Sequence, residues 1–156
     1  MNNPKIQFKN VRKDFYSQNE TLKVLDDINL YVRDGEFVSI LGPSGCGKST
    51  IFHILTGLES EYEGSICIEG MPLKEWNKKM CYMHQKDLLM PWRTLMKNVL
   101  LPLEIQGINK AKAEEKVKEM LPVFGLEGFE KAYPNELSGG MRQRAALLRT
   151  ILIDSD

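Results

Sequence analysis

Residues 42–49 read Gly-Pro-Ser-Gly-Cys-Gly-Lys-Ser and match the phosphate-loop pattern G-x-x-x-x-G-K-[ST] at every fixed position. An apolar run at residues 36–41 precedes the loop, and Ile51, Ile54 and Leu55 recur at helical spacing after it. Glycines let backbone N–H groups converge on phosphate oxygens, and the start of a helix adds a positive dipole end. The sequence therefore predicts a buried strand, a phosphate loop and a helix in succession.

The pattern assigns different chemistry to different residues of this loop. The ammonium of Lys48 is expected to bridge the β- and γ-phosphates, and the hydroxyl of Ser49 is expected to ligate Mg²⁺. ATP and Mg²⁺ are therefore the predicted ligands. The predicted phosphate-binding residues are Gly42, Pro43, Ser44, Gly45, Cys46, Gly47, Lys48, Ser49 and Thr50.

Hydrophobic periodicity and turn residues predict the other elements. Strands are expected at residues 6–11, 22–32, 65–69 and 80–84. Thr94 is a predicted N-cap of a helix that runs toward Glu104 and ends at Gly107. A further helix contains Val117 and is broken or kinked by Pro122, and the last helix has Met141, Ala145, Leu148 and Leu152 on one face. Strands come first and helices follow, so the predicted class is mixed α/β.

Composition narrows the function classes. The 156 residues contain 21 Lys+Arg and 21 Asp+Glu, and this zero net charge argues against a general nucleic-acid binder. No apolar run approaches the roughly 18 residues of a membrane-spanning helix, and the N-terminus has no apolar secretion signal. The chain has three cysteines, an odd number, and no C-x-x-C pair. This pattern argues against a disulfide framework and against a structural zinc site. The expected protein is reduced, cytosolic and free of nucleic acid.

A second motif supports a more specific interpretation. Residues 137–144 read Leu-Ser-Gly-Gly-Met-Arg-Gln-Arg and resemble the LSGGQ-type signature of ATP-binding cassette (ABC) proteins, with Met141 where that family often has glutamine. Ser138 is a good N-cap residue, and the two glycines leave helix-start N–H groups accessible. The resemblance implies that Ser138, Gly139 and Gly140 contact the γ-phosphate held by a second subunit.

Two other positions match ABC motifs. Gln85 lies 37 residues after Lys48 and 53 before Ser138, and it resembles the Q-loop glutamine that contacts Mg²⁺ or the attacking water. Phe15 resembles the A-loop aromatic that stacks on adenine, with Tyr16 as the alternative. The resemblance thus implies a catalytic set of Lys48, Gln85 and Ser138 (acting in trans), and metal contacts from Ser49 and Gln85.

The family resemblance also implies an architecture. It predicts a P-loop NTPase of ABC type, with a RecA-like core, an N-terminal antiparallel β-subdomain and a helical subdomain. The expected division is 1–86 for the β-subdomain and phosphate-loop core, 87–136 for the helical subdomain, and 137–156 for the signature and its helix. The family's Walker B strand and Asp-Glu pair would follow Asp156. The chain is accordingly expected to be the N-terminal part of a longer subunit and to bind ATP without efficient hydrolysis. Reduced stability is also expected, with a tendency to self-associate or to depend on the missing C-terminal part.

Residues 88–99, which contain Pro91-Trp92 and Asn98-Val99, resemble importer ATPases of the nitrate, sulfonate and taurine group. That resemblance implies a membrane-spanning permease that contacts the chain near Trp92 and Arg93, a second nucleotide-binding subunit arranged head to tail, and, indirectly, an external substrate-binding protein. It also implies a location at the inner face of the cell membrane. The alternatives are an exporter or lipoprotein-release ATPase and a soluble ABC ATPase of repair or translation. A P-loop kinase is more distant, because it lacks the motif at residues 137–144.

Overall fold

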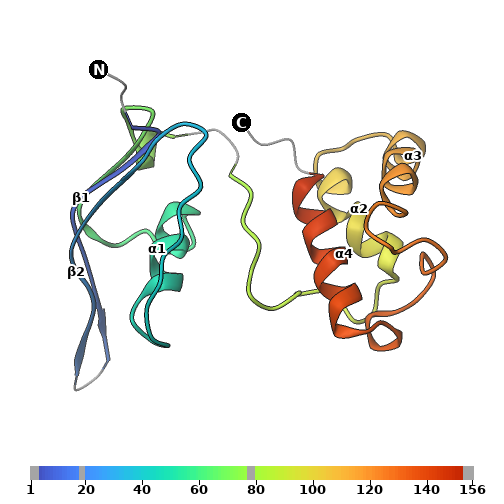
Figure 1. Ribbon diagram of the computed structural model, residues 1–156, viewed down its shortest axis with the longest axis horizontal. Coiled ribbons are helices and arrows are strands. Elements are labelled where there is room, and N and C mark those ends of the chain that lie inside the picture. The colour runs from blue at the N-terminus through green and yellow to red at the C-terminus, as the bar shows by residue number, and fades with distance from the viewer. Residues whose placement is uncertain (1–3, 18–19, 77–79, 153–156) are drawn as a thin grey trace. The chain divides into compact units, whose positions relative to one another are not determined.

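The computed structural model describes residues 4–17, 20–76 and 80–152. The described residues divide into two compact units, a first unit that ends before residue 77 and a second unit that begins after residue 79. Figure 1 traces the ribbon of both units. Each unit has its own cluster of buried apolar side chains.

The first unit contains a four-stranded antiparallel sheet. Strands β1 (Ile6–Tyr16) and β2 (Thr21–Val32) form a long hairpin, and β3 (Glu63–Ile68) pairs with the other edge of β1. The short strand β4 (Met71–Pro72) completes the order β2-β1-β3-β4, and a 3-10 turn, η1 (Leu73–Glu75), follows it. This arrangement confirms the antiparallel N-terminal sheet and the strands predicted at residues 6–11, 22–32 and 65–69.

Helix α1 (Lys48–Leu55) contributes to the core of this unit. Its buried residues, Ile51 and Ile54, belong to the same apolar cluster as Phe8, Val11, Leu25 and Ile66 of the sheet. The helix ends where predicted, because Gly57 adopts a left-handed φ of 74° just after the C-cap residue Thr56. The apolar spacing after the phosphate loop therefore indicated the correct element and the correct buried face.

Two predicted strands are wrong. Residues 36–41 and 80–84 contain no strand, and Phe37 and Leu41 are 93% and 91% exposed. An apolar run becomes a buried strand only when neighbouring strands satisfy its backbone and another layer covers its side chains. Within the part of the chain that the structure describes, neither segment has a pairing partner in the sheet.

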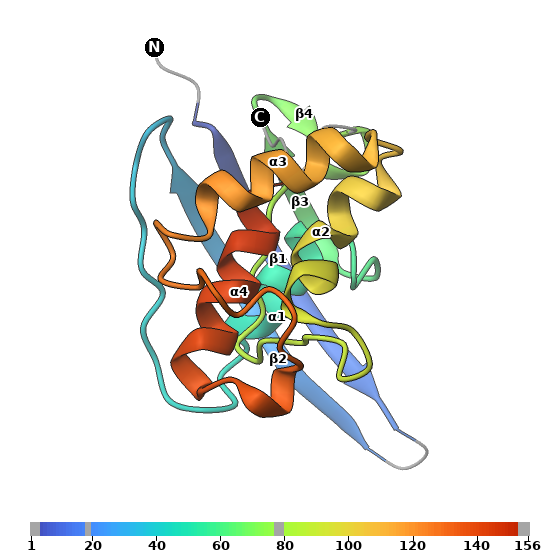
Figure 2. The same cartoon turned by 90° about the vertical axis from the view of Figure 1, so that its right-hand side faces the viewer.

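The second unit is helical (Figure 2). It contains α2 (Leu95–Ile105), α3 (Lys110–Met120), the 3-10 turn η2 (Pro134–Glu136) and α4 (Gly139–Ile151), and α2 packs against both α3 and α4. Thr94, Asn109 and Ser138 cap the three α-helices with their side chains. The predicted caps at Thr94 and Ser138 and the helix end before Pro122 are confirmed. None of the helices described here is long and apolar enough to cross a membrane.

Leucine and alanine side chains from all three helices fill the core of this unit. Leu95, Val99 and Leu103 of α2 recur every four residues and are at most 1% exposed. Their stripe packs with small and branched residues of the other two helices, so the apolar periodicity becomes one contiguous core. The partners on α3 and α4 are Ala113, Val117, Ala145 and Leu148.

Candidate functional site

The phosphate loop depends on glycine at two positions. Gly45 and Gly47 have φ values of 82° and 90°, which side-chain-bearing residues rarely adopt. A Cβ atom on Gly47 would lie 2.8 Å from Leu25 Cδ2 and 2.8 Å from the carbonyl oxygen of Val24. The loop therefore packs directly on strand β2, and Gly47 provides both the turn and the close approach.

The side chain of Lys48 folds back over this loop. Its Nζ donates to the carbonyl oxygens of Gly42 at 2.8 Å and Pro43 at 2.5 Å, and it lies 3.5 Å from Cys46 Sγ. Helix α1 starts at Lys48 without a side-chain cap, because its N-cap residue is Gly47. The ammonium and the first N–H groups of α1 thus lie at the same end of the helix, where they complement a negative charge. The exposed hydroxyl of Ser49 lies at this helix start as well.

The predicted adenine-stacking residue lies in the same unit. Phe15 is the second-last residue of β1 and is 40% exposed, whereas Tyr16 is 78% exposed. The Nζ of Lys13 lies 4.8 Å from the centroid of the Phe15 ring, which is a cation–π distance. Lys13 itself is 6% exposed and forms an ion pair with Glu59 at 3.1 Å. The Phe15 ring therefore has a charged neighbour, and no comparable contact fixes Tyr16 among the interactions of the described residues.

The signature residues form the start of α4. Ser138 Oγ accepts a hydrogen bond from the backbone N–H of Met141 at 3.3 Å, and Gly139 and Gly140 are exposed. Arg142, further along α4, reaches back and donates to the carbonyl oxygen of Leu137 at 2.7 Å. This turn is thus held by its own helix, and the glycine N–H groups remain accessible for an anion.

Side chains of α4 also hold the segment that contains Gln85, here called the Gln85 segment (residues 85–88). Gln143 Nε2 donates to the carbonyl oxygen of Gln85 at 3.1 Å, and Arg142 Nε lies 3.2 Å from Asp87 Oδ2. Arg149 donates to the carbonyl oxygens of Asp87 at 2.8 Å and Leu88 at 2.9 Å. The structure therefore brings the predicted Q-loop glutamine and the signature helix together within the second unit.

Two features show how tightly this segment is held. Leu88 has a left-handed φ of 46°, a conformation that is unfavourable for a leucine. Burial lowers the pKa of the Arg149 guanidinium from its usual value, although the nearby Asp87 carboxylate acts in the opposite direction. The backbone strain at Leu88 and the desolvation of the Arg149 guanidinium both cost free energy. The hydrogen bonds from Arg149 to the carbonyl oxygens of residues 87 and 88 offset these two costs.

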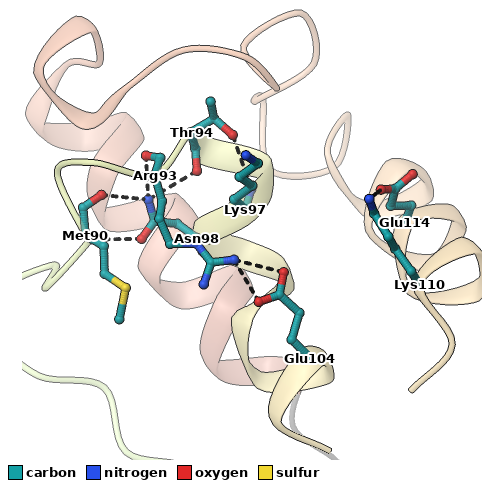
Figure 3. Close-up of polar contacts among 8 residues, drawn as sticks. All are labelled: Met90, Arg93, Thr94, Lys97, Asn98, Glu104, Lys110 and Glu114. Atoms are coloured by element: carbon teal, nitrogen blue, oxygen red, sulfur yellow. Dashed lines mark hydrogen bonds and ion pairs between the residues drawn. The ribbon is translucent and has the colours of Figure 1, made fainter. Parts of the chain in front are cut away.

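The turn at residues 90–94 follows and is organised by a buried amide (Figure 3). Asn98 is 0% exposed; its Oδ1 accepts from the backbone N–H of Met90 at 2.7 Å. Its Nδ2 donates to the carbonyl oxygens of Met90, Arg93 and Thr94 at 3.1, 2.9 and 3.1 Å. Arg93 in turn binds both carboxylate oxygens of Glu104 at 2.8 and 2.7 Å.

Trp92 projects from this fixed turn and is 73% exposed. The alternative that Trp92 is buried within its own helical unit is therefore wrong. A large exposed aromatic on a rigid turn is typical of a protein-contact surface.

Across the described ranges, no group of three or more His, Cys, Asp or Glu side chains lies close enough to hold a metal ion. The candidate metal contacts are the neutral oxygens of Ser49 and Gln85. Hydroxyl and amide oxygens suit Mg²⁺, which keeps several water ligands and binds through nucleotide phosphates.

The sequence profile of the ABC transporter family matches residues 25–156. The chain belongs to this family. Among curated relatives, an uncharacterized ABC transporter ATP-binding protein of Methanocaldococcus jannaschii is 43% identical over 152 residues, 97% of this chain and 57% of that protein. The aliphatic sulfonates import ATP-binding protein SsuB of Bacillus cereus is 41% identical over 149 residues, 96% of this chain and 58% of that protein. The chain thus spans a little more than half the length of these relatives.

Solved ABC cassettes share the fold. A dimeric ATP-binding cassette in a post-hydrolysis state, bound to ADP and Pi, superposes with a TM-score of 0.81 at 32% identity; the match covers 94% of this chain and 68% of that one. A second dimeric structure, of a bacterial ABC transporter cassette, gives the same TM-score at 33% identity. The predicted ABC-type fold is thereby confirmed.

Phe15 and residues 42–50 lie in the first unit, whereas Gln85 and residues 138–140 lie in the second.

Sequence reasoning missed the residues that hold these motifs in place. For Asn98 the sequence did contain a signal: it is a polar residue next to the apolar stripe of α2, and a polar group at such a position is buried only with hydrogen-bond partners. The partners of Lys13 and Arg149 are 46 and 62 residues away in the sequence, too far for any local pattern to indicate.

Proposed function

We propose that this chain is the nucleotide-binding part of an ATP-hydrolysing subunit that powers an ABC importer. The observation that carries the proposal is the arrangement at the start of α1. There, the Lys48 ammonium lies over a glycine-dependent loop, 2.8 Å from the carbonyl oxygen of Gly42. A triphosphate entering the loop would replace these neutral carbonyl partners with charged phosphate oxygens, which are stronger acceptors for an ammonium. Family membership and the ADP and Pi bound to a solved cassette support a nucleotide as the ligand.

The proposed nucleotide contacts follow the motifs. Residues 42–50 hold the phosphates, Phe15 stacks on the adenine, and Ser138, Gly139 and Gly140 contact the γ-phosphate held by a second subunit. Ser49 and Gln85 contribute oxygens to Mg²⁺, which supplies charge neutralisation at the phosphates when bound. The dimeric state of the solved cassettes supports a head-to-tail pair in which each signature faces the partner's phosphate loop.

We further propose that the 90–94 turn contacts a membrane permease at the inner face of the membrane. The exposed Trp92 and the fixed backbone beneath it support this contact. The similarity to proteins named for sulfonate import supports a small solute such as a sulfonate, taurine or nitrate, delivered by an external binding protein. The solute would be bound by the permease and that capture protein, not by this chain.

Replacing Lys48 tests the nucleotide site directly. Lys48→Ala removes a charge-assisted contact worth about 1.5–3 kcal/mol, so the affinity for Mg²⁺-ATP should fall by about ten- to a hundredfold. The exposed residue Lys9 offers a matched control in the same unit, since Lys9→Ala removes a lysine far from the loop in sequence. Titration with a fluorescent ATP analogue measures both variants. Equal affinities of wild type and Lys48→Ala would contradict the proposal.

Hydrolysis is expected to be negligible in this chain. The 156 residues contain no Asp-Glu pair after an apolar strand, which the family uses to polarise the attacking water. Release of inorganic phosphate, measured on protein of verified mass, should not exceed that of Lys48→Ala. Turnover at the rate of a full-length relative would overturn this expectation.

A further inference from the structure

The first unit contains an unusual buried cation. Within residues 4–17, 20–76 and 80–152, Lys13 is the one lysine or arginine classed as buried, at 6% exposure. A buried ammonium is costly unless a charged partner compensates for lost hydration. Here the partner is Glu59, whose Oε1 lies 3.1 Å from Lys13 Nζ. The hydrogen bond from Lys13 holds the pKa of the Glu59 carboxyl below its usual value, so the ionised carboxylate is favoured beside the ammonium.

The same ammonium contacts an aromatic ring. Its Nζ lies 4.8 Å from the centroid of Phe15, two residues further along β1. The pairing of β1 with β2 changes register next to Lys13, so the measured contact, and not regular strand alternation, places the ammonium beside the ring. The cation thus lies between a carboxylate that fixes it and a ring whose orientation it restricts. Phe15 retains 40% exposure, so part of its ring surface is available to a ligand.

Glu59 connects this pair to the phosphate loop through α1. The backbone N–H of Glu59 donates to the carbonyl oxygen of His53, a residue of α1, at 3.0 Å. The Glu59 carboxylate also accepts from the backbone N–H of Glu61 at 3.2 Å, which restricts its rotamer. A short chain of contacts therefore runs from the helix that starts at Lys48, through Glu59, to the Lys13 ammonium.

A second contact joins the same region of the sheet to the loop. Lys13 pairs in register with Leu25 on β2, and Leu25 is the residue against which Gly47 packs. The pair of strands that carries Lys13 is therefore fixed to the phosphate loop on one side and to the end of α1 on the other. Together these contacts set the separation between the loop and the Phe15 ring.

We propose that Lys13 is a positioning residue that holds the Phe15 ring at a fixed place relative to the phosphate loop, so that one nucleotide contacts both. The inference rests on the proposed nucleotide site. It assigns Lys13 to recognition of the base and not to recognition of the phosphates. It also assigns Glu59 the role of keeping the ammonium in place.

Comparing two ligands separates this role from a general effect on folding. ATP contacts the loop and the ring, whereas inorganic triphosphate contacts the loop alone. Lys13→Met retains the aliphatic stem and removes the charge, and it should weaken ATP binding by about three- to fivefold while changing the dissociation constant for triphosphate less than twofold. Lys9→Met, an exposed lysine of the same strand, is the matched control and should change neither.

Two further variants keep the test decisive. Lys13→Met with Glu59→Gln leaves no unpaired charge, so it should fold at least as well as Lys13→Met and show the same loss for ATP. In a Phe15→Leu background, Lys13→Met should have no further effect on ATP binding, because its action passes through the ring. Parallel weakening of ATP and triphosphate, or an undiminished effect in the Phe15→Leu background, would overturn the positioning role. If the unaltered chain binds neither ligand, the proposed function itself is wrong, and this inference falls with it.

Discussion

Asn98 gives the sharpest test of the forces that organise the second unit. Its amide is fully buried and connects the backbone of the 90–94 turn to α2. Asn98→Ala removes one acceptor and two amide hydrogens, which are shared among three carbonyl oxygens. At about 1 kcal/mol for each of three effective hydrogen bonds, the free energy of unfolding should fall by about 3 kcal/mol. The loss includes the hydrogen bond from the half-buried backbone N–H of Met90 to Asn98 Oδ1.

Asn109 provides the matched control because it is an exposed asparagine in the same unit. Its side chain caps α3 by accepting from the backbone N–H groups of Ala111 at 3.0 Å and Lys112 at 3.4 Å. Loss of such an exposed cap in Asn109→Ala should cost about 1 kcal/mol. Urea denaturation followed by far-ultraviolet circular dichroism reports mainly on this unit, since α2, α3 and α4 supply most of the helical residues.

Hydrogen exchange adds a local measurement. In Asn98→Ala the backbone amide of Met90 should lose its protection, whereas in Asn109→Ala it should keep it. The reasoning fails if Asn98→Ala costs no more than Asn109→Ala, or if the Met90 amide exchanges equally slowly in both variants. Either result would show that apolar packing, and not the buried amide, fixes the turn.

Two other changes probe the surface and the acid response. In the full-length subunit, Trp92→Ala should reduce co-purification with the permease and substrate-stimulated ATP hydrolysis while leaving ATP affinity unchanged; intact assembly and stimulation would exclude Trp92 from the contact. The hydrogen bond from Lys13 lowers the pKa of the Glu59 carboxyl below its usual value of 4.5, so the ionised carboxylate stabilises the fold fully above pH 4.5. This stabilisation is lost as the pH falls through the lower folded-state pKa. Acid denaturation should therefore be less steep below pH 4.5 in Glu59→Gln than in wild type, and identical profiles would remove the pair from the stability of the first unit.

Local chemistry explains why some elements were predictable. Thr94 and Ser138 are cap residues followed by apolar periodicity, and the information that starts each helix lies within a few residues of the cap. The phosphate loop is similar, because Gly45 and Gly47 require positive φ values that the glycine pattern itself indicates. For these parts of the chain, local sequence and structure agree.

The errors arise where the outcome depends on distant partners. The apolar residues at 36–41 resemble a buried strand, but their composition carries no information about whether a neighbouring strand pairs with them. Exposure of Trp92 was likewise undetermined, because a Trp beside a proline suits either a core or an interface. The Lys13–Glu59 pair depends on where α1 ends relative to β1, which only the folded chain sets. Long-range charge pairs therefore required the structure.

The contacts from α4 to the Gln85 segment also define what can be exchanged between relatives when chimaeric subunits are built. Arg142, Gln143 and Arg149 recognise one carboxylate and three backbone carbonyl oxygens of residues 85–88. A graft of α4 alone would place foreign side chains against an unmatched loop and leave the left-handed Leu88 without its guanidinium support. The smallest transplantable block is therefore discontinuous in sequence: residues 85–88 have to travel with residues 138–151.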